Sequence, residues 1–304
     1  MRSAELDYLL CACGDIYKAP DIEPKKHNIR KVIEIAHDNR LLYYLIKSNP
    51  QIYENMDDDL KRVVNELLNL HKQYFCRLNK SISGINKILG QNTYLVIKTI
   101  SNYPHITKDI DIVVRDVSGS LDSFLEEGYR HTFQEPPYKQ TVMKNGLISM
   151  TLHQRVAWGK VVPMNVDFLW ENPRKIKFNG LDVQLPSVEA DLLTLMAHVP
   201  FELLYFRLGD LLYMFKLSKQ ADWKKIIYQA KTNNWFGTLK NVVSIMNGLH
   251  RSMYNEPSPI ENMIPSYRNV KTVFPFRYPL TLILKAHIEK RAWEKIFSVK
   301  NYFK

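Results

Sequence analysis

Two carboxylates, Asp109 and Asp111, lie within the stretch ITKDIDIVV, whose other residues have the apolar, β-branched character of a buried strand. Side chains two residues apart on a strand point to the same face, so we expect both carboxylates to project together while Ile110 and Ile112 point into the core. Two adjacent carboxylates repel each other, and a bound divalent cation removes that repulsion. An oxygen-only pair suits Mg²⁺, which accepts one or two carboxylates together with substrate phosphates. The pattern predicts a magnesium site, and its alternative is a half-exposed strand whose charged side chains face water.

A third acid and a basic turn strengthen the metal interpretation. Asp167 lies in MNVDFLW, which we predict to be a second strand of the same sheet. Three acids on two adjacent strands can hold two cations about 4 Å apart, the arrangement used in in-line phosphoryl transfer. Upstream, VIKTISNYPHITK predicts a strand followed by a turn. Its candidates for holding a triphosphate are Lys98, Thr99, Ser101 and Lys108.

Three regions of different periodicity position these residues. Residues 1–90 have apolar side chains at spacings of three and four, which predicts a helical region. Residues 91–186 predict a core of helix and strand with a small mixed sheet, including hairpins at Asn145-Gly146, expected to be a type I′ turn, and at Asn179-Gly180. Residues 187–304 return to helical periodicity, with Ser187 as an expected N-cap. The expected fold class is therefore α+β, a mixed-sheet core flanked by two helical regions.

The composition indicates a folded protein of the cytoplasm. Hydrophobic residues make up 45% of the 304 and charged residues 24%, as in globular proteins. The three cysteines are too few for a disulfide framework, which favours reduced thiols. The N-terminus has no apolar signal-peptide core, and no run of about 18 apolar residues occurs, so we expect neither secretion nor a membrane span.

The net charge of +11 is concentrated near the C-terminal end. Residues 1–215 are balanced, with 26 basic and 26 acidic side chains. Residues 216–240 contain six basic and one acidic side chain, and residues 251–304 contain ten and four. A one-sided basic region is typical of a polyanionic partner such as RNA, although it is also compatible with a solvated helical surface.

The order of these motifs resembles the nucleotidyltransferase fold of the DNA polymerase β superfamily. The chain is similar in particular to a poorly characterised nucleotidyltransferase family of bacteria and archaea. The similarity extends over about residues 90–245, through "IK" followed by a small residue, "DIDIVV", "EEGY", "VDFLW" and the helical stretch that begins "LPSVEADLLTLMAHVP". The resemblance implies that Asp109 and Asp111 bind two Mg²⁺ ions, or Mn²⁺ in their place. It also implies that Asp167 completes the catalytic metal site and helps to lower the pKa of the acceptor hydroxyl.

The phosphate turn departs from the superfamily. The usual Gly-Ser or Lys-Gly is replaced by a turn that runs from Lys98 through Thr99 to Ser101. A β-branched Thr99 restricts φ and prevents the close backbone approach that glycine permits. This departure favours the alternative of an inactive nucleotide- or RNA-binding module with the same fold.

The resulting hypothesis is a Mg²⁺-dependent nucleotidyltransferase that moves a nucleoside monophosphate from an NTP to a hydroxyl acceptor and releases pyrophosphate. ATP is the default donor, and RNA or another polyanion is the expected acceptor because Lys and Arg contacts to phosphates dominate such binding. A metal-dependent glycosyltransferase also uses two aspartates spaced in this way. Those folds start with a longer parallel sheet, whereas this chain starts with helices, so that alternative is less consistent with the sequence.

Overall fold

The computed structural model describes residues 4–13, 28–135, 139–158, 161–203 and 205–264. Its N-terminal part is helical, as predicted, with helices α1 (Ala4–Cys13), α2 (Ile29–Asp38), α3 (Leu42–Ser48), α4 (Pro50–Glu54) and α5 (Asp58–Leu89). The N-cap of the long helix α5 is Asp57, whose carboxylate accepts the backbone N–H of Leu60 at 2.7 Å. It ends before Gly90, whose φ of +85° favours glycine.

Five strands form a mixed sheet in the order β1-β2-β5-β4-β3. Their bounds are β1 (Tyr94–Ile97), β2 (Asp109–Val114), β3 (Arg130–Glu135), β4 (Lys139–Met143) and β5 (Ser149–His153), with helix α6 (Val117–Glu126) between β2 and β3. Strands β2 and β5 are parallel, and the other neighbours are antiparallel. Strands β6 (Arg174–Phe178) and β7 (Leu181–Leu185) form a separate hairpin. The α+β class and the mixed sheet are thus as predicted.

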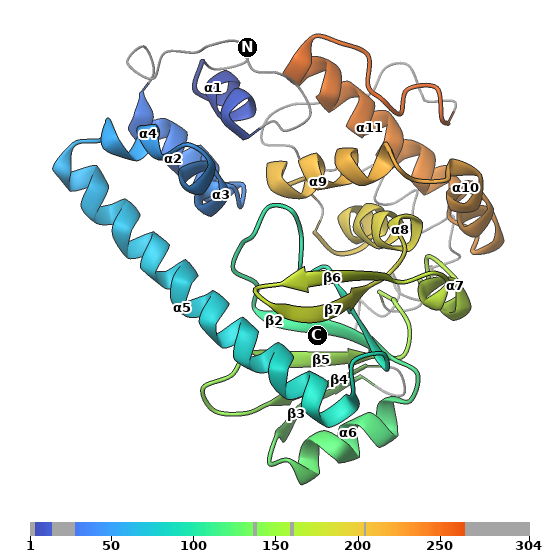
Figure 1. Ribbon diagram of the computed structural model, residues 1–304. Coiled ribbons are helices and arrows are strands. Elements are labelled where there is room, and N and C mark those ends of the chain that lie inside the picture. The colour runs from blue at the N-terminus through green and yellow to red at the C-terminus, as the bar shows by residue number, and fades with distance from the viewer. Residues whose placement is uncertain (1–3, 14–27, 136–138, 159–160, 204, 265–304) are drawn as a thin grey trace, which may run out of the picture.

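The two faces of the sheet pack against different helices. Ile110 and Ile112 of β2 are fully buried in a core shared with α5 and α6. Val113, on the opposite face, belongs to the core of the N- and C-terminal helices. Figure 1 shows α5 crossing the molecule beside the strands, with the C-terminal helices at the other side of the sheet. Because residues two apart share a face, Asp109 and Asp111 lie on the side of Val113, toward those helices.

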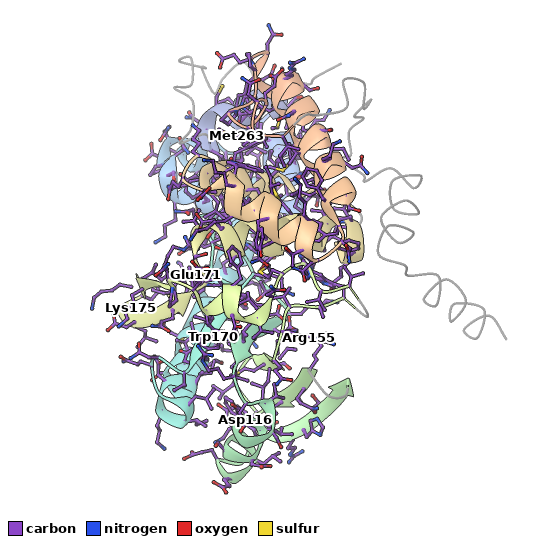
Figure 2. The ribbon with its side chains drawn as sticks, turned by 90° about the vertical axis from the view of Figure 1, so that its right-hand side faces the viewer. Asp116, Arg155, Trp170, Glu171, Lys175 and Met263 are labelled. Carbon is purple, nitrogen blue, oxygen red and sulfur yellow. The ribbon has the colours of Figure 1, made fainter. Side chains whose placement is uncertain are left out.

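The C-terminal helices share a hydrophobic core with residues of β1 and β2. They are α8 (Val188–His198), the π-helix η2 (Val199–Leu203), α9 (Leu208–Ser218), α10 (Trp223–Thr232) and α11 (Phe236–Tyr254). Ser187 caps α8 as expected, because its hydroxyl accepts the N–H of Ala190 at 3.2 Å. Figure 2 shows these helices at one end of the molecule and the strands with α6 at the other. Residues 265–304, the last part of the region predicted to be helical, lie outside the described residues.

The stretch around Asp167 is not a strand. It forms a short helix, α7 (Val166–Trp170), so the prediction of a strand was wrong. The neighbours Phe168 and Leu169 are both buried. A strand would point them to opposite faces, whereas one helical turn lets both face the core. Trp170 and the following Glu171 are labelled in Figure 2, between the helices and the sheet.

The two Asn-Gly turns differ from each other. Asn179 and Gly180 have φ values of +47° and +86°, as a type I′ hairpin turn requires. At the other turn Gly146 has a φ of +79°, but Asn145 is not among the described residues with positive φ. The hairpin between β4 and β5 forms as expected, but its turn is not type I′.

In the part of the chain that the structure describes, every helix is too short or too polar to cross a membrane.

Candidate active site

A cavity of about 440 Å³ lies where the N-terminal helices, the sheet and the C-terminal helices meet. That volume is typical of a small-molecule site. Five of the predicted site residues line it, namely Lys98, Thr99, Lys108, Asp109 and Asp111. Ser101 and Asp167 do not. The structure therefore brings together the two strand aspartates and the basic turn, without the third acid expected from the sequence.

Asp111 is fixed through both of its carboxylate oxygens. The Lys98 ammonium lies 3.1 Å from Oδ2, and Nε2 of His153 lies 2.6 Å from Oδ1. Burial would raise the pKa of Asp111, but the charge and hydrogen bonds of Lys98 and His153 outweigh it and hold that pKa well below its usual range. The carboxylate is therefore charged and held in one orientation.

Asp109 has a different environment. The hydroxyl of Thr151, on the parallel strand β5, donates to its Oδ2 at 3.0 Å. Burial and the neighbouring charge of Asp111 both raise the pKa of Asp109. The pKa of Asp109 is thus raised while that of Asp111 is lowered, so Asp109 is the better proton acceptor of the two carboxylates.

The turn after β1 is built around Lys98. Its φ is +56°, and the N–H of Thr99 donates to the carbonyl of Ile97 at 2.6 Å across it. The position that would favour glycine is thus Lys98, and not Thr99 as the sequence suggested. Thr99 is buried, and its hydroxyl donates to Ile97 O and accepts the N–H of Asp111, each at 3.1 Å. Thr99 therefore connects the end of β1 to β2, and its hydroxyl hydrogen is already donated to the carbonyl of Ile97.

The other two predicted triphosphate contacts differ in position. The Ser101 hydroxyl donates to the carbonyl of Tyr103 at 2.9 Å and accepts the Tyr103 N–H at 3.1 Å, so it closes the loop. Lys108 is exposed at the edge of the cavity. Of the two, Lys108 is the one placed to meet a ligand.

Asp167 is exposed on α7 and does not line the cavity. The expectation that it lies on a strand beside β2 was wrong, because the strand beside β2 in that direction is β5. The positions of β5 that pair with Asp109 and Asp111 are Ser149 and Thr151. The alternation of polar and apolar residues predicts a strand at LISMTLHQ, and the structure confirms it as β5, but no pattern in the sequence indicated that it pairs with β2.

Glu202 is a cavity acid that the sequence did not indicate. It lies on the π-helix η2. π-Helical turns are rare in proteins as a whole, but those that occur are often at functional sites. Its Oε2 accepts from Nε1 of Trp158 and lies 2.8 Å from Nε2 of His198. Burial would raise the pKa of Glu202, but His198, Lys98 and Trp158 outweigh it and lower that pKa to about 2. The cavity thus has a third charged carboxylate, supplied by the C-terminal helices.

Arg40, between α2 and α3, brings the N-terminal region into the same cavity. Its Nη1 donates to Nε2 of His105 at 2.8 Å and lies 3.6 Å from Oδ1 of Asp210. The preceding residue, Asn39, accepts the N–H groups of Leu208 and Gly209, both at 3.1 Å. These contacts fix the position of Arg40 relative to α9.

The donor set fits one Mg²⁺ better than two. Asp109 and Asp111 can together contribute the one or two carboxylates that Mg²⁺ takes when substrate phosphates supply further ligands. Among the residues that the structure describes, no group of three or more His, Cys, Asp or Glu side chains could hold a metal ion. A preformed three-acid site of the kind expected from the sequence is therefore not present in the described part of the chain.

An α+β core with two aspartates on one strand, facing a cavity lined by lysines, is the arrangement that the resemblance to nucleotidyltransferases predicts. Residues 105–249 match the model of a family described as "Uncharacterised nucleotidyltransferase". The match extends from β2 to α11, and it supports the assignment of the chain as a nucleotidyltransferase. The resemblance drawn from DIDIVV and the following helices is confirmed. No curated protein matches the chain.

Proposed function

We propose that the protein is a Mg²⁺-dependent nucleotidyltransferase that transfers a nucleoside monophosphate from an NTP, with ATP as the default donor, to a hydroxyl acceptor. The observation that supports this proposal best is the placement of Asp109 and Asp111 on one face of β2, inside a cavity that also contains Lys98 and Lys108. The family match supports nucleotidyl transfer in general.

In this reaction the acceptor oxygen forms a bond to the α-phosphorus while the bond from that phosphorus to the β-bridging oxygen breaks. Pyrophosphate leaves with the bonding electrons, and the hydroxyl proton passes to a base. Asp111, held by Lys98 and His153, stays ionised.

The cofactor would be held by Asp109 and Asp111 together with nucleotide phosphates. When bound, Mg²⁺ supplies positive charge that neutralises the phosphates and the leaving pyrophosphate. The remaining contacts would come from two lysines that line the cavity. Lys108 would contact the triphosphate from the exposed edge, and Lys98 would do so through the N–H donors that are not directed to Asp111.

We propose RNA as the acceptor, with other polyanions as alternatives. Six of the seven charged residues in 216–240 are basic. On α10, Lys224, Tyr228 and Lys231 are exposed and spaced as one helix face. Two lysines that flank an exposed aromatic ring offer both phosphate contacts and base stacking.

The test is incorporation of α-labelled NTPs, one at a time with Mg²⁺ or Mn²⁺, into total cellular RNA and into the protein itself. We expect label in RNA with the wild-type protein and a loss of at least about 100-fold for Asp109→Asn or Asp111→Asn, since each removes a carboxylate that would hold the cation. Full activity of Asp109→Asn would contradict the proposal. The circular dichroism spectrum of each variant shows whether it is folded.

A second candidate, a nucleotide-binding module without turnover, is favoured by the position of Asp167 outside the cavity. It predicts that a nucleotide raises the melting temperature in a metal-dependent way although no NTP yields labelled product. The labelling experiment combined with a melting-temperature measurement therefore distinguishes the two.

A further inference from the structure

The Lys98 ammonium lies among the acidic side chains of the cavity. It is 3.1 Å from Oδ2 of Asp111, and the side chains of Lys98 and Asp111 are 15% and 14% exposed. Glu202 and Asp109 also interact electrostatically with it. On its remaining side it lies 5.8 Å from the centre of the Trp158 ring, within reach of a cation–π interaction.

The backbone at Lys98 has a conformation that is unusual for a lysine. Six non-glycine residues in the described part of the chain have positive φ, and four of them are asparagine, which tolerates that conformation. The other two are Lys98 and Arg40, with φ values of +56° and +62°, and both line the cavity. A lysine in a conformation that favours glycine is uncommon, and such residues cluster at functional sites.

The carboxylate oxygens near Lys98 leave room for one divalent cation. Oδ2 of Asp111 faces the Lys98 ammonium at 3.1 Å, and Oδ1 of Asp111 faces Nε2 of His153 at 2.6 Å. Oδ2 of Asp109 accepts the hydroxyl of Thr151 at 3.0 Å. A second cation at this pair would have to displace Lys98 from Asp111.

We infer that Lys98 is a built-in counter-cation that takes the place of one of the two metal ions expected for this class of site, so that the enzyme binds a single divalent cation with its nucleotide. The inference rests on the proposed function. Lys98 neutralises Asp111 from inside the protein, which explains why no third acid is needed at the position predicted for Asp167.

The experiment counts Mn²⁺ bound per molecule of the full-length protein. Equilibrium dialysis with saturating MnCl₂ and a radiolabelled α,β-methylene ATP analogue measures bound metal and bound analogue together, after subtraction of the chamber without protein. We expect one Mn²⁺ and one analogue per wild-type chain. Lys98→Gly removes the ammonium and suits the positive φ, and Lys98→Asn is a second neutral variant that tolerates it. For both we expect two Mn²⁺ per analogue.

Two controls separate charge from structure. Lys98→Arg keeps the positive charge and should stay at one Mn²⁺. Lys177→Ala removes a lysine from an exposed pair with Asp182, 3.4 Å away and outside the cavity, and should also stay at one. Two Mn²⁺ on the wild-type protein, or one on both neutral variants, would overturn the inference while leaving the proposed function intact. Analogue binding by the wild type that needs no metal would contradict the proposed function itself, and the inference with it.

Discussion

Nε2 of His153 lies 2.6 Å from Oδ1 of Asp111, and the two residues belong to the neighbouring parallel strands β5 and β2. His153 pairs in register with Val113, so its ring reaches two pairs along the strands to meet the carboxylate of Asp111. The other oxygen faces Lys98. Partners of this kind orient a metal-binding carboxylate, and their loss typically costs 10–100-fold in metal affinity or activity.

Substitution of His153 by Gln should therefore lower nucleotide-dependent Mn²⁺ affinity and the transfer rate, each by about 10–100-fold. The measurement is a Mn²⁺ titration in the presence of the ATP analogue, followed by labelling with α-labelled ATP. His131→Gln is the matched control because His131 is exposed on β3. Equal behaviour of the two variants would show that the His153 contact does not position Asp111.

Asp167→Asn should leave nucleotidyl transfer within about twofold of the wild type, because surface substitutions away from a site have small effects. Asp167 is exposed on α7 and does not line the cavity. Its comparison with Asp111→Asn uses the same labelling assay. A loss for Asp167→Asn as large as that for Asp111→Asn would place it at the reacting centre after all.

The sequence was sufficient to predict β2 because alternation is a local property. In DIDIVV, the isoleucines are buried and the aspartates partly exposed, as the period of two requires. MNVDFLW is too short for periodicity to separate a strand from a helical turn. The wrong prediction of a strand at Asp167 followed from this ambiguity, and it led to the expectation that Asp167 lies beside Asp109 and Asp111.

The parts of the site that could not be predicted depend on contacts between distant segments. Arg40 and Glu202 reach the cavity only because α2, the sheet and α8 pack together, and no spacing in the chain records that packing. The conformation of Lys98 is likewise set by its ion pair with Asp111 and by the turn around it. Sequence reasoning identified Lys98 as basic and near phosphate, but not as the partner of an aspartate.

A buried ion pair between the β6–β7 hairpin and the C-terminal helices should stabilise the fold. Nη2 of Arg174 lies 2.6 Å from Oδ2 of Asp191, which also accepts the hydroxyl of Tyr213 at 2.7 Å. Asp191 is only 4% exposed, so Arg174→Met would leave a buried charge without its main partner. We expect the free energy of unfolding in urea to fall by about 3 kcal/mol.

The control for this prediction lies on the same strand. Lys177 pairs with Asp182 at 3.4 Å, but both side chains are exposed. Lys177→Met should change the free energy of unfolding by less than about 0.5 kcal/mol. Similar losses for the two variants would mean that the Arg174 pair contributes no more than a surface pair.

His105 should make stability depend on pH below neutrality. Burial, followed by the charge of Arg40, lowers the pKa of His105 to about 4. The unfolded chain therefore binds a proton near pH 6.5 that the folded protein does not accept until about pH 4, so stability falls as the pH drops through this interval. At pH 5 the contribution amounts to about 2 kcal/mol relative to neutral pH.

The measurement compares the free energy of unfolding at pH 7 and pH 5 for wild type and His105→Asn. The variant should lose less stability on acidification than the wild type, by about 2 kcal/mol. His131→Asn, at an exposed position, should keep the full wild-type dependence. Identical pH profiles for wild type and His105→Asn would show that His105 is not held neutral by Arg40 and burial.

The exposed face of α10 provides the most direct test of RNA as the acceptor. Tyr228 is 64% exposed between Lys224 and Lys231. If this face binds RNA, Tyr228→Ala should weaken binding of a labelled single-stranded oligonucleotide by about 1–3 kcal/mol, the value of one stacked base.

Lys224→Ala should reduce the slope of log affinity against log salt by about one, since it removes one phosphate contact. Lys225, the next residue, pairs with Glu171 at 2.9 Å and is the matched control, because its ammonium is already engaged. A smaller slope for Lys224→Ala than for Lys225→Ala would assign the phosphate contact to the face defined by Tyr228, whereas equal slopes would exclude that face and direct the search for the acceptor to the cavity itself.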